Sequence, residues 1–329
     1  MPTKARAIRI TEPGGPEVLQ LCDLEVADPG PGQVLVEVAA AGINRADLLQ
    51  RRGLYAAPAG YPADIPGLEY AGVVARVGEG VSRWSPGDRV MGIVGGGGLA
   101  THVVVHDREV IAAPKNMELT EVAAIPEVFL TAFDAMFTRG HARMGEWMVI
   151  HAAGSGVGIA ALQLGQSAGL RCIGTSRTAS KLERLRDLGL EHSIVVEGKS
   201  FADQVQAITK GGADVILDFI GGAYLGENLK AAAVLGRIVV IGLMGGAKAE
   251  MPMGLLLRKR LTMTGTVLRA RPLEEKAALA QRFAREAVPL FESGALKPVV
   301  DSVMPMADAA EAHSRMEAND TCGKLILRW

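Results

Sequence analysis

The strongest constraint on the fold is an apolar strand that runs directly into a cluster of glycines and then into a helix. It lies in VIHAAGSGVGIAALQLGQSAG (149–169), where the turn is formed by Gly154, Ser155, Gly156, Val157 and Gly158. Glycines allow the backbone to approach a pyrophosphate, and a helix N-terminus offers unpaired N–H groups and the positive end of the helix dipole. We therefore predict a dinucleotide-binding turn. Because the spacing is not a strict G-x-G-x-x-G, an ordinary tight strand–helix turn remains the alternative.

The rest of the chain shows two patterns of predicted secondary structure. The first 120 or so residues read as short strands separated by Pro- and Gly-rich turns, which favours a barrel or a partly closed sandwich. After Met117, apolar strands alternate with predicted helices over 157–168, 180–188, 201–209 and 224–234. This alternation is typical of a parallel sheet covered on both faces. A charged helix over 273–293 and two strands follow. A chain of 329 residues is long enough for two domains.

The region after the second strand of the α/β part indicates which dinucleotide is bound. An NAD site usually has an acidic residue about 20 residues beyond the glycines, but none occurs between Trp147 and Lys181. Ser176, Arg177 and Lys181 lie there instead, and a hydroxyl with two cations suits a 2′-phosphate. We therefore expect NADPH. The alternative is that the two cations belong only to a solvated helix start.

Composition narrows the class of partner. The formal charge is −1 with mixed signs, so neither nucleic acid nor an anionic membrane is expected as a partner. No stretch is apolar enough to predict a membrane span, and the first residues contain no apolar signal region. The three cysteines show no zinc-knuckle spacing. We expect a cytoplasmic catalyst that acts on a small molecule.

A second motif, PGLEYAG (66–72), resembles the G-H-E-x-x-G signature of zinc alcohol dehydrogenases. Leu68 stands where those enzymes have a zinc-binding His, and Asn44 in AGINRADLL stands where they have a Cys. Neither replacement is a ligand that zinc prefers, so we expect no metal. Glu69 then needs another role. We expect it to be structural and paired with an arginine such as Arg45 or Arg89, and the alternative is a proton carrier.

These substitutions, with several longer segments, resemble one family. The segments are ITEPGGPEVLQL, GINRADLLQRRGLY, GDRVMGIVGGGGLA, AAIPEVFLTAF, GGAKAEMPMGLLLRKRLTMTGTVLRAR and DAAEAHSRMEAN. The chain resembles the zinc-free quinone oxidoreductase (zeta-crystallin-like) branch of the medium-chain dehydrogenase/reductases, especially the tumour-suppressor-inducible NADPH quinone oxidoreductase subgroup. The resemblance implies an α/β protein with a GroES-like, β-rich domain over 1–121 and 268–329. It also implies a doubly wound Rossmann domain over 122–267, with the site in the cleft between the two domains.

The resemblance also suggests roles for individual residues. Asn44 and Tyr55 would flank the nicotinamide and the acceptor, and Thr131 would approach the nicotinamide amide. The loop beside the nicotinamide ribose would contain Gly242, Leu243 and Met244, and Leu268 and Arg269 would form a strand edge near the ring. Val196 stands where many relatives have a Tyr near the adenosine.

The function implied is reduction of a quinone by NADPH. This reaction needs orientation more than a tuned acid, because water can protonate the hydroquinone anion. Tyr55, assisted by Asn44, would hydrogen-bond the acceptor oxygen, or Tyr55 would serve only as a pocket wall. Reduction of an enone or enoyl thioester is the alternative within enzymes, and a cofactor-binding sensor or moonlighting protein is the alternative outside them. LTMTGTVL (261–268) reads as a sheet edge, and we expect a homodimer to pair there.

Overall fold

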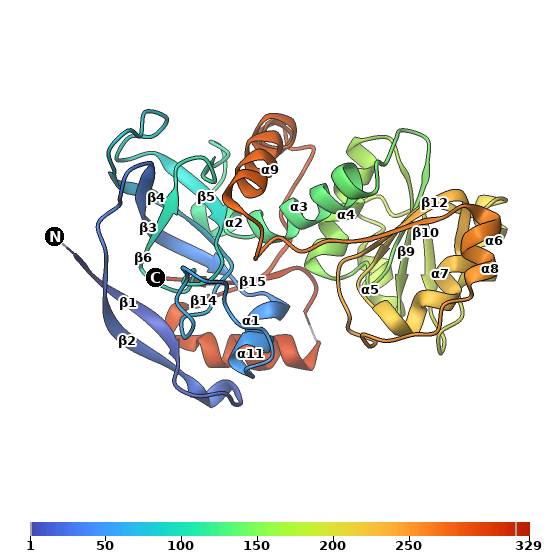
Figure 1. Cartoon of the computed structure of the whole chain (residues 1–329), viewed down its shortest axis with the longest axis horizontal. Coiled ribbons are helices and arrows are strands. Elements are labelled where there is room, and N and C mark those ends of the chain that lie inside the picture. Colours follow the sequence, from blue (N-terminus) through green and yellow to red (C-terminus); the bar gives the residue numbers. More distant parts are fainter. Residues whose placement is uncertain (1, 320) are drawn as a thin grey trace. The chain divides into compact units, whose positions relative to one another are not determined.

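The computed structural model describes residues 2–319 and 321–329, which form two compact units (Figure 1). The first unit contains the chain up to Leu130 together with Leu268–Trp329, and the second contains Thr131–Val267. The division after Leu130 lies within helix α3 (Pro126–Phe133), beyond the expected division at 121/122. Helix α2 and the first turns of α3 therefore belong to the first unit.

The first unit is built mainly of antiparallel strands. Its strands are β1 (Thr3–Ile10), β2 (Leu19–Val26), β3 (Gln33–Gly42), β4 (Glu69–Val77), β5 (Arg89–Ile93), β6 (His102–His106), β7 (Ile111–Ala112), β14 (Val300–Pro305) and β15 (Lys324–Arg328). Its helices are α1 (Arg45–Arg51), α2 (Leu119–Val122), α3, α9 (Leu273–Glu286), α10 (Val288–Glu292) and α11 (Ala309–Ala318). The main sheet has the order β14-β15-β3-β4-β5-β7, with β6 also paired to β3.

Valines that alternate along these strands fill the interior of the first unit. Val34, Val36 and Val38 of β3 pack with Val90 and Val103 in one buried cluster. Alternate residues of a strand point to the same face, so this spacing places the apolar side chains together. The C-terminal strand β15 completes the sheet because it pairs antiparallel with β3, Ile326 opposite Gly42. The two ends of the chain's sequence thus build one unit.

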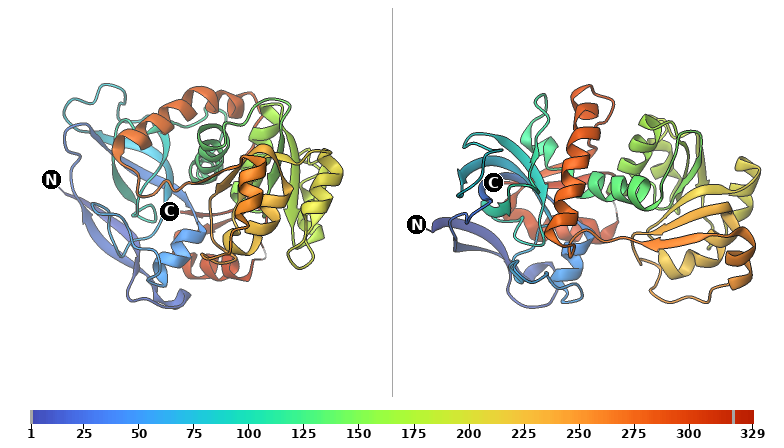
Figure 2. Two further views of the ribbon diagram at one scale, coloured as in Figure 1. Left: turned by 45° about the vertical axis from the view of Figure 1, so that its right-hand side comes forward. Right: turned by 45° about the horizontal axis from the view of Figure 1, so that its top comes forward.

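The second unit is a six-stranded parallel sheet with helices on both faces (Figure 2). Its strands are β8 (Trp147–Ile150), β9 (Arg171–Ser176), β10 (His192–Val195), β11 (Ala213–Asp218), β12 (Ala232–Val240) and β13 (Thr262–Gly265). Its helices are the π-helix η2 (Asp134–Arg139), α4 (Gly156–Ser167), α5 (Ala179–Arg184), α6 (Ala202–Thr209), α7 (Leu225–Ala231) and α8 (Met253–Lys259). The order β10-β9-β8-β11-β12-β13 is that of a dinucleotide-binding doubly wound sheet, whose strand order reverses between β8 and β11.

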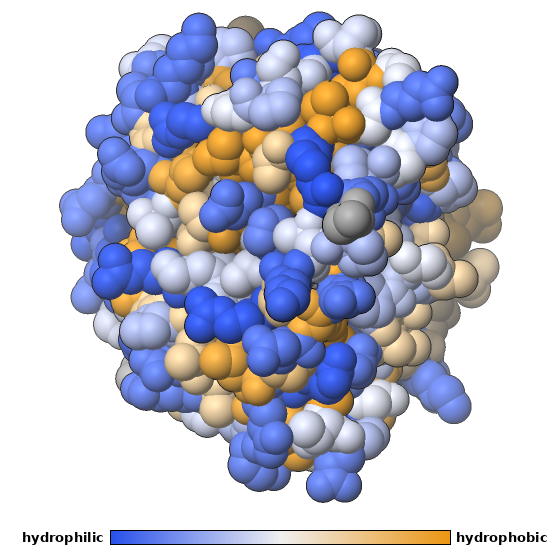
Figure 3. Space-filling model, turned by 90° about the vertical axis from the view of Figure 1, so that its left-hand side faces the viewer, coloured by the Kyte–Doolittle hydropathy of each residue, from blue (hydrophilic) through white to orange (hydrophobic). Residues whose placement is uncertain are grey.

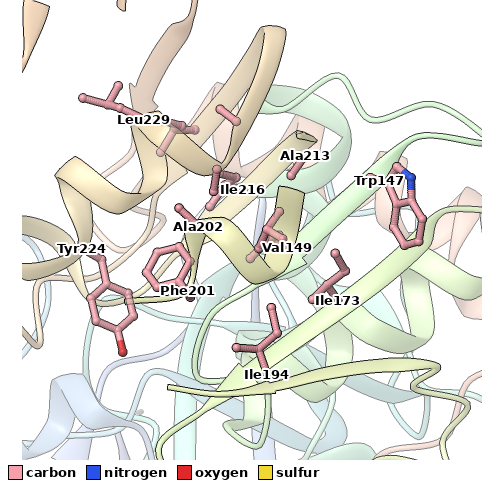
Figure 4. Packing of buried hydrophobic residues seen from close by; sticks show 14 of the residues in the cluster. Trp147, Val149, Ile173, Ile194, Phe201, Ala202, Ala213, Ile216, Tyr224 and Leu229 are labelled. Carbon is pink, nitrogen blue, oxygen red and sulfur yellow. The ribbon is translucent and has the colours of Figure 1, made fainter. Parts of the chain in front are cut away.

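The core of this sheet is apolar and includes aromatic side chains from two helical segments (Figure 4). Val149 and Ile216 from the central strands are fully buried, and Phe201 and Tyr224 pack on one another with ring centroids 5.0 Å apart. Central parallel strands are covered on both faces, which explains their continuous apolar runs. The packing holds the carboxyl ends of β8 and β11 in place.

Three predicted helices have different bounds in the structure. The helix expected over 224–234 ends at Ala231, and Ala232 already begins β12. The ammonium of Lys259 donates to the carbonyls of Leu229 and Ala232 and so satisfies the end of α7. The helix expected over 180–188 is the shorter α5. The helix expected over 273–293 is split into α9 and α10, because Pro289 has no N–H to donate.

No helix within the described residues is long and apolar enough to cross a membrane. On the face shown in Figure 3, hydrophobic patches are interrupted by hydrophilic side chains. Of the described residues, the three most exposed large apolar side chains, those of Leu54, Met144 and Leu257, lie far apart in the sequence.

Candidate functional site

The predicted dinucleotide turn joins β8 to α4, as the glycine pattern requires. Ser155 caps the helix, because its Oγ accepts a hydrogen bond from the Gly158 N–H at 3.1 Å. A Cβ on Gly158 would lie 2.6 Å from the carbonyl oxygen of Ala153, so only glycine allows this close packing. A Cβ on Gly154 would lie 3.2 Å from the side chain of Lys181. Lys181, one of the two predicted cations, therefore lies beside the glycine turn.

The other predicted cation, Arg177, and the predicted hydroxyl, that of Ser176, lie at the end of the neighbouring strand β9. Ser176 is the last residue of β9, and its Oγ accepts a hydrogen bond from the Thr178 N–H at 3.1 Å. Arg177 is exposed and makes no hydrogen bond or ion pair within residues 2–319 and 321–329. No acidic side chain occurs on β9. The carboxyl end of β9 therefore carries the Arg177 guanidinium and the Ser176 hydroxyl, and the strand contributes no carboxylate.

The loop after β12 is fixed to the end of β11 by backbone hydrogen bonds. The N–H groups of Ile241 and Gly242 donate to the carbonyl oxygen of Asp218, and that of Met244 donates to Phe219. The side chains of Leu243 and Met244 are 55% and 54% exposed. Since the carboxyl ends of parallel strands share one edge, this loop, the glycine turn and the end of β9 lie along the same edge of the sheet.

A buried chain of polar side chains lies behind this edge, and the sequence did not point to it. Nδ1 of His151 lies 2.8 Å from the Thr175 hydroxyl, and Nε2 lies 2.7 Å from Oδ1 of Asn228. The Asn228 amide nitrogen then donates to Asp218 at 3.0 Å. His151 is therefore the neutral Nε2–H tautomer, with the threonine hydroxyl donating to Nδ1. Burial lowers the pKa of His151 and raises that of Asp218.

In the first unit, Tyr55 is held by an arginine that the resemblance placed near the nicotinamide. The Arg269 guanidinium lies over the Tyr55 ring, 4.9 Å from its centroid, and donates to the Tyr55 carbonyl oxygen at 3.2 Å. It also donates to the carbonyl oxygen of Gly95 at 2.7 Å. The half-buried Tyr55 hydroxyl has no hydrogen-bond partner within the described part of the chain. That hydroxyl is therefore free to bind a ligand.

Leu268 and Arg269 do not form a strand edge, which corrects the expectation from the resemblance. Strand β13 ends at Gly265, and the two residues lie in the turn that follows, closed by a hydrogen bond from the Arg271 N–H to the Leu268 carbonyl. Both side chains are buried, at 4% and 7% exposed. Thr131, the other residue predicted near the nicotinamide, is buried on α3 at 8% exposed.

The predicted partner of Glu69 is wrong, because its carboxylate binds a lysine and not Arg45 or Arg89. Oε1 of Glu69 lies 2.5 Å from the Lys324 ammonium and accepts from the Asn44 amide at 2.9 Å. Oε2 accepts from the Glu127 N–H at 2.8 Å. Arg45 bonds Asn319, and Arg89 bonds backbone carbonyls. Both lie outside this cluster.

The same cluster fixes the side chain of Asn44. Its amide nitrogen donates to Glu69 and, at 3.3 Å, to the Gly42 carbonyl, while its Oδ1 accepts from Lys324 at 2.7 Å. Both amide hydrogens are therefore used inside the protein. Asn44 has one remaining acceptor site on Oδ1 and no donor for an acceptor oxygen. The assisting hydrogen bond expected from Asn44 thus requires one of these bonds to break.

Two further carboxyl groups, those of Asp47 and Glu127, lie near Asn44, and the sequence did not single out either. Asp47 is fully buried and accepts from the N–H groups of Asn44 and Gly67 at 2.8 and 2.9 Å. Burial raises the pKa of Asp47 to about 6. Glu127 lies in the first turn of α3, and burial together with the charge of Glu69 raises its pKa to about 8. The only signal in the sequence was their position, since GINRADLL contains Asp47 and AAIPEVFLTAF contains Glu127.

Leu68 and Asn44 stand where the zinc alcohol dehydrogenases have their ligands, and neither side chain is a thiolate or an imidazole. Leu68 is 2% exposed and contributes only an apolar side chain. Within the described residues, no group of three or more His, Cys, Asp or Glu side chains is arranged to hold a metal ion. The cation that Asn44 and Glu69 share is the Lys324 ammonium.

Known protein families match both parts of the chain. Residues 30–115 match the alcohol dehydrogenase GroES-like domain, and residues 156–285 match the family described as zinc-binding dehydrogenase. The human quinone oxidoreductase is 31% identical over 326 residues, which cover 98% of this chain and 97% of the relative. The synaptic vesicle membrane protein VAT-1 homolog of Rattus norvegicus is 33% identical over 313 residues, covering 91% and 77%.

Solved structures with the same fold include several kinds of oxidoreductase. The CurK enoyl reductase superposes with a TM-score of 0.88 at 28% identity and covers 99% of both chains. An NAD-dependent alcohol dehydrogenase superposes with a TM-score of 0.87 at 32% identity and covers 98% of this chain and 99% of its own. These neighbours share a fold that binds nicotinamide cofactors.

Proposed function

The chain belongs to the medium-chain dehydrogenase/reductase family, and from this premise we propose that it is an NADPH-dependent quinone reductase that needs no zinc. One observation carries the proposal. Asn44 and Glu69, which lie in the motifs that resemble zinc-site motifs, form a closed, hydrogen-bonded cluster with Lys324. A lysine ammonium that is already neutralised by Glu69 supplies charge balance but has no open coordination position for a substrate oxygen. Quinone reduction tolerates the lack of a Lewis acid, because water can protonate the hydroquinone anion that forms.

The second unit supplies residues that suit NADPH. The glycine turn allows close backbone approach, and Arg177 and Lys181 would hold the 2′-phosphate. The loop Gly242, Leu243 and Met244 would lie along the ribose. When bound, the cofactor supplies the hydride.

The first unit supplies the groups that bind and orient the acceptor. The Tyr55 hydroxyl would donate to the acceptor oxygen, and the Arg269 guanidinium holds the ring in place. Negative charge that develops on the acceptor oxygen is stabilised by this hydrogen bond and by the nearby guanidinium. Asn44 holds the loop before α1 in place through its bonds to Glu69 and Lys324.

Reduction of an enone or enoyl thioester is the second candidate, and the fold shared with the CurK enoyl reductase favours considering it. Both reactions need a hydride donor and an oriented acceptor. The acceptors differ after hydride transfer, because an enolate must be protonated at carbon whereas water readily protonates the oxygen of a hydroquinone anion. A cofactor-binding sensor would bind NADPH without steady turnover.

We also propose a cytoplasmic homodimer. Strand β13 pairs with β12 on one side and with no other strand of the described residues, so one edge of the sheet is left unpaired. Met263 and Val267 on and beside this strand are 40% and 52% exposed. An apolar edge strand is usually covered, and pairing with the same edge of a second copy would cover it.

Steady-state oxidation of NADPH tests the proposed function. The purified protein is assayed with 1,4-naphthoquinone and with cyclohex-2-enone at equal concentrations. We expect sustained turnover with the quinone and slower turnover with the enone. A higher kcat/KM for the enone favours the second candidate, and binding of NADPH without turnover of either acceptor contradicts both enzyme proposals.

A further inference from the structure

Glu127 differs from the other acidic residues around Asn44 in the state of its carboxyl group. Its backbone N–H donates to Oε2 of Glu69 at 2.8 Å, which fixes the first turn of α3 beside that carboxylate. Its own side chain is half-buried, and its carboxyl oxygens make no hydrogen bond or ion pair with the residues that the structure describes. Glu127 thus presents an unused carboxyl group that remains accessible.

The two neighbouring carboxylates, those of Asp47 and Glu69, already have hydrogen-bond partners. Asp47 accepts from two backbone N–H groups, and Glu69 accepts from Lys324, Asn44 and the backbone of Glu127. Both oxygens of each of these two carboxylates already accept a hydrogen bond. Of the three carboxyl groups, only Glu127 combines access with unoccupied oxygens.

The titratable groups that face Glu127 come from several elements. They are Glu69 on β4, Asp47 on α1, Lys324 on β15, Arg269 after β13 and the neutral Tyr55 phenol before β4. Three ionised carboxylates would face two cations, which leaves one excess negative charge in a mostly buried cluster. A proton on Glu127 makes the cluster neutral, and a neutral cluster is the less costly state in a low-dielectric site.

The electrostatics agree with this count. Burial and the charge of Glu69 raise the pKa of Glu127 to about 8, so the group is largely protonated at neutral pH. The pKa of Tyr55 is also raised, mainly by burial and in part by Glu127. The two side chains are therefore within electrostatic range of one another. Thr131 follows Glu127 by one helical turn on α3, on the same side of that helix.

We propose that Glu127 is a catalytic acid that protonates the acceptor after hydride transfer, an inference that rests on the proposed function. The acceptor gains an electron pair with the hydride and becomes an anion. The O–H bond of the Glu127 carboxyl breaks, and its proton forms an O–H bond on a hydroquinone anion or a C–H bond on an enolate. The resulting carboxylate is reprotonated by water. With Glu127 as the acid, the site can also reduce acceptors whose reduced anion must be protonated.

The test compares Glu127→Gln with wild type and with a matched control. Glutamine keeps the size and the backbone bond to Glu69 but has no acidic proton. Glu311→Gln is the control, because Glu311 also lies in the first turn of a helix but is exposed. The readout is kcat from pH 6 to 9 with NADPH and each acceptor that wild type reduces, 1,4-naphthoquinone or cyclohex-2-enone.

We expect Glu127→Gln to lower kcat at pH 7 by about 100-fold with the enone, the lower range for a positioned acid, and by less with the quinone. Wild-type kcat should fall as the pH rises past about 8, where the carboxyl loses its proton. That fall should be absent from Glu127→Gln and unchanged in Glu311→Gln. A Glu127→Gln enzyme with wild-type kcat and a wild-type pH profile overturns the inference.

A second readout does not depend on turnover. A carboxyl whose folded pKa is raised binds more protons in the folded than in the unfolded state between its two pKa values. The free energy of unfolding of wild type should therefore fall relative to that of Glu127→Gln as the pH rises from about 4.5 to about 8, and the difference should then level off. A pH-independent difference shows that Glu127 holds no proton and overturns the inference. If wild type reduces neither acceptor, the proposed function fails, and this unfolding series alone decides whether Glu127 holds the proton.

Discussion

The ammonium of Lys324 lies 2.5 Å from Oε1 of Glu69, and both side chains are almost completely buried. Gly42 makes room for this contact, because a Cβ there would lie 2.8 Å from Cε of Lys324 and closer still to Glu69. The pair joins the C-terminal strand β15 to β4 at the place where Asn44 begins α1. One ion pair therefore links the tail of the chain to the residues proposed to orient the acceptor.

Removing the lysine should strongly destabilise the first unit. Lys324→Met leaves a buried, unpaired carboxylate, and we expect the free energy of unfolding to fall by about 3–5 kcal/mol in urea titrations. Lys4→Met, at an exposed position of β1, is the control and should change it by less than about 0.5 kcal/mol. Adding Glu69→Gln to Lys324→Met should restore part of the loss, since it removes the unpaired charge. A Lys324→Met variant as stable as the control would contradict this account of Glu69.

Tyr55→Phe tests the hydrogen bond to the acceptor. The ring would stay under Arg269, and only the unpartnered hydroxyl is lost. We expect kcat/KM for 1,4-naphthoquinone to fall about 10-fold, as for one lost hydrogen bond, with an unchanged melting temperature. A loss of about 100-fold or more would assign Tyr55 the part of a general acid and would be at odds with the role given to Glu127.

Arg177→Ala and Lys181→Ala test the 2′-phosphate site. Each should raise KM for NADPH by about 10-fold or more and leave KM for NADH nearly unchanged, because only NADPH carries the phosphate. Arg184→Ala removes an exposed cation from the last turn of α5 and serves as the control. Equal effects on the two cofactors would show that these cations do not bind the 2′-phosphate.

His151 should remain neutral in the native protein at pH values where exposed histidines are charged. Its burial lowers its pKa, so nitrogen NMR should show an Nε2–H tautomer that persists below pH 6.5. The unfolded chain binds a proton there and the folded chain does not, so this residue contributes a loss of stability as the pH falls below about 6.5. A doubly protonated ring at pH 6 would contradict the hydrogen-bond directions in this network.

The sequence was informative where local patterns decide the structure. The glycine turn, the alternation of strands and helices and the cations after β9 all depend on short segments, and all lie where the pattern placed them. The bounds of α7 were wrong, because Lys259 satisfies its last carbonyls and lets β12 begin at Ala232. Local propensity cannot anticipate a lysine about 30 residues away that caps a helix.

The partners of the buried charges were beyond the reach of the sequence for the same reason. The sequence predicts an arginine partner for Glu69, but its cation is the Lys324 ammonium from β15. Glu127 and Asp47 stand out only in the structure, where burial raises the pKa of both carboxyl groups. Pair interactions between distant segments depend on the tertiary fold, so charge type and spacing alone indicated a need for a partner without naming it.

The ratio of kcat/KM for NADPH to that for NADH, measured with 1,4-naphthoquinone on protein dialysed against a metal chelator, tests the proposed zinc-free NADPH reductase most directly. We predict a ratio of at least about 10 and full activity after dialysis, because Arg177 and Lys181 would both face the 2′-phosphate and Lys324 supplies the only cation held by Asn44 and Glu69 among the residues that the structure describes. A preference for NADH, or activity that returns only when zinc is added, would contradict it.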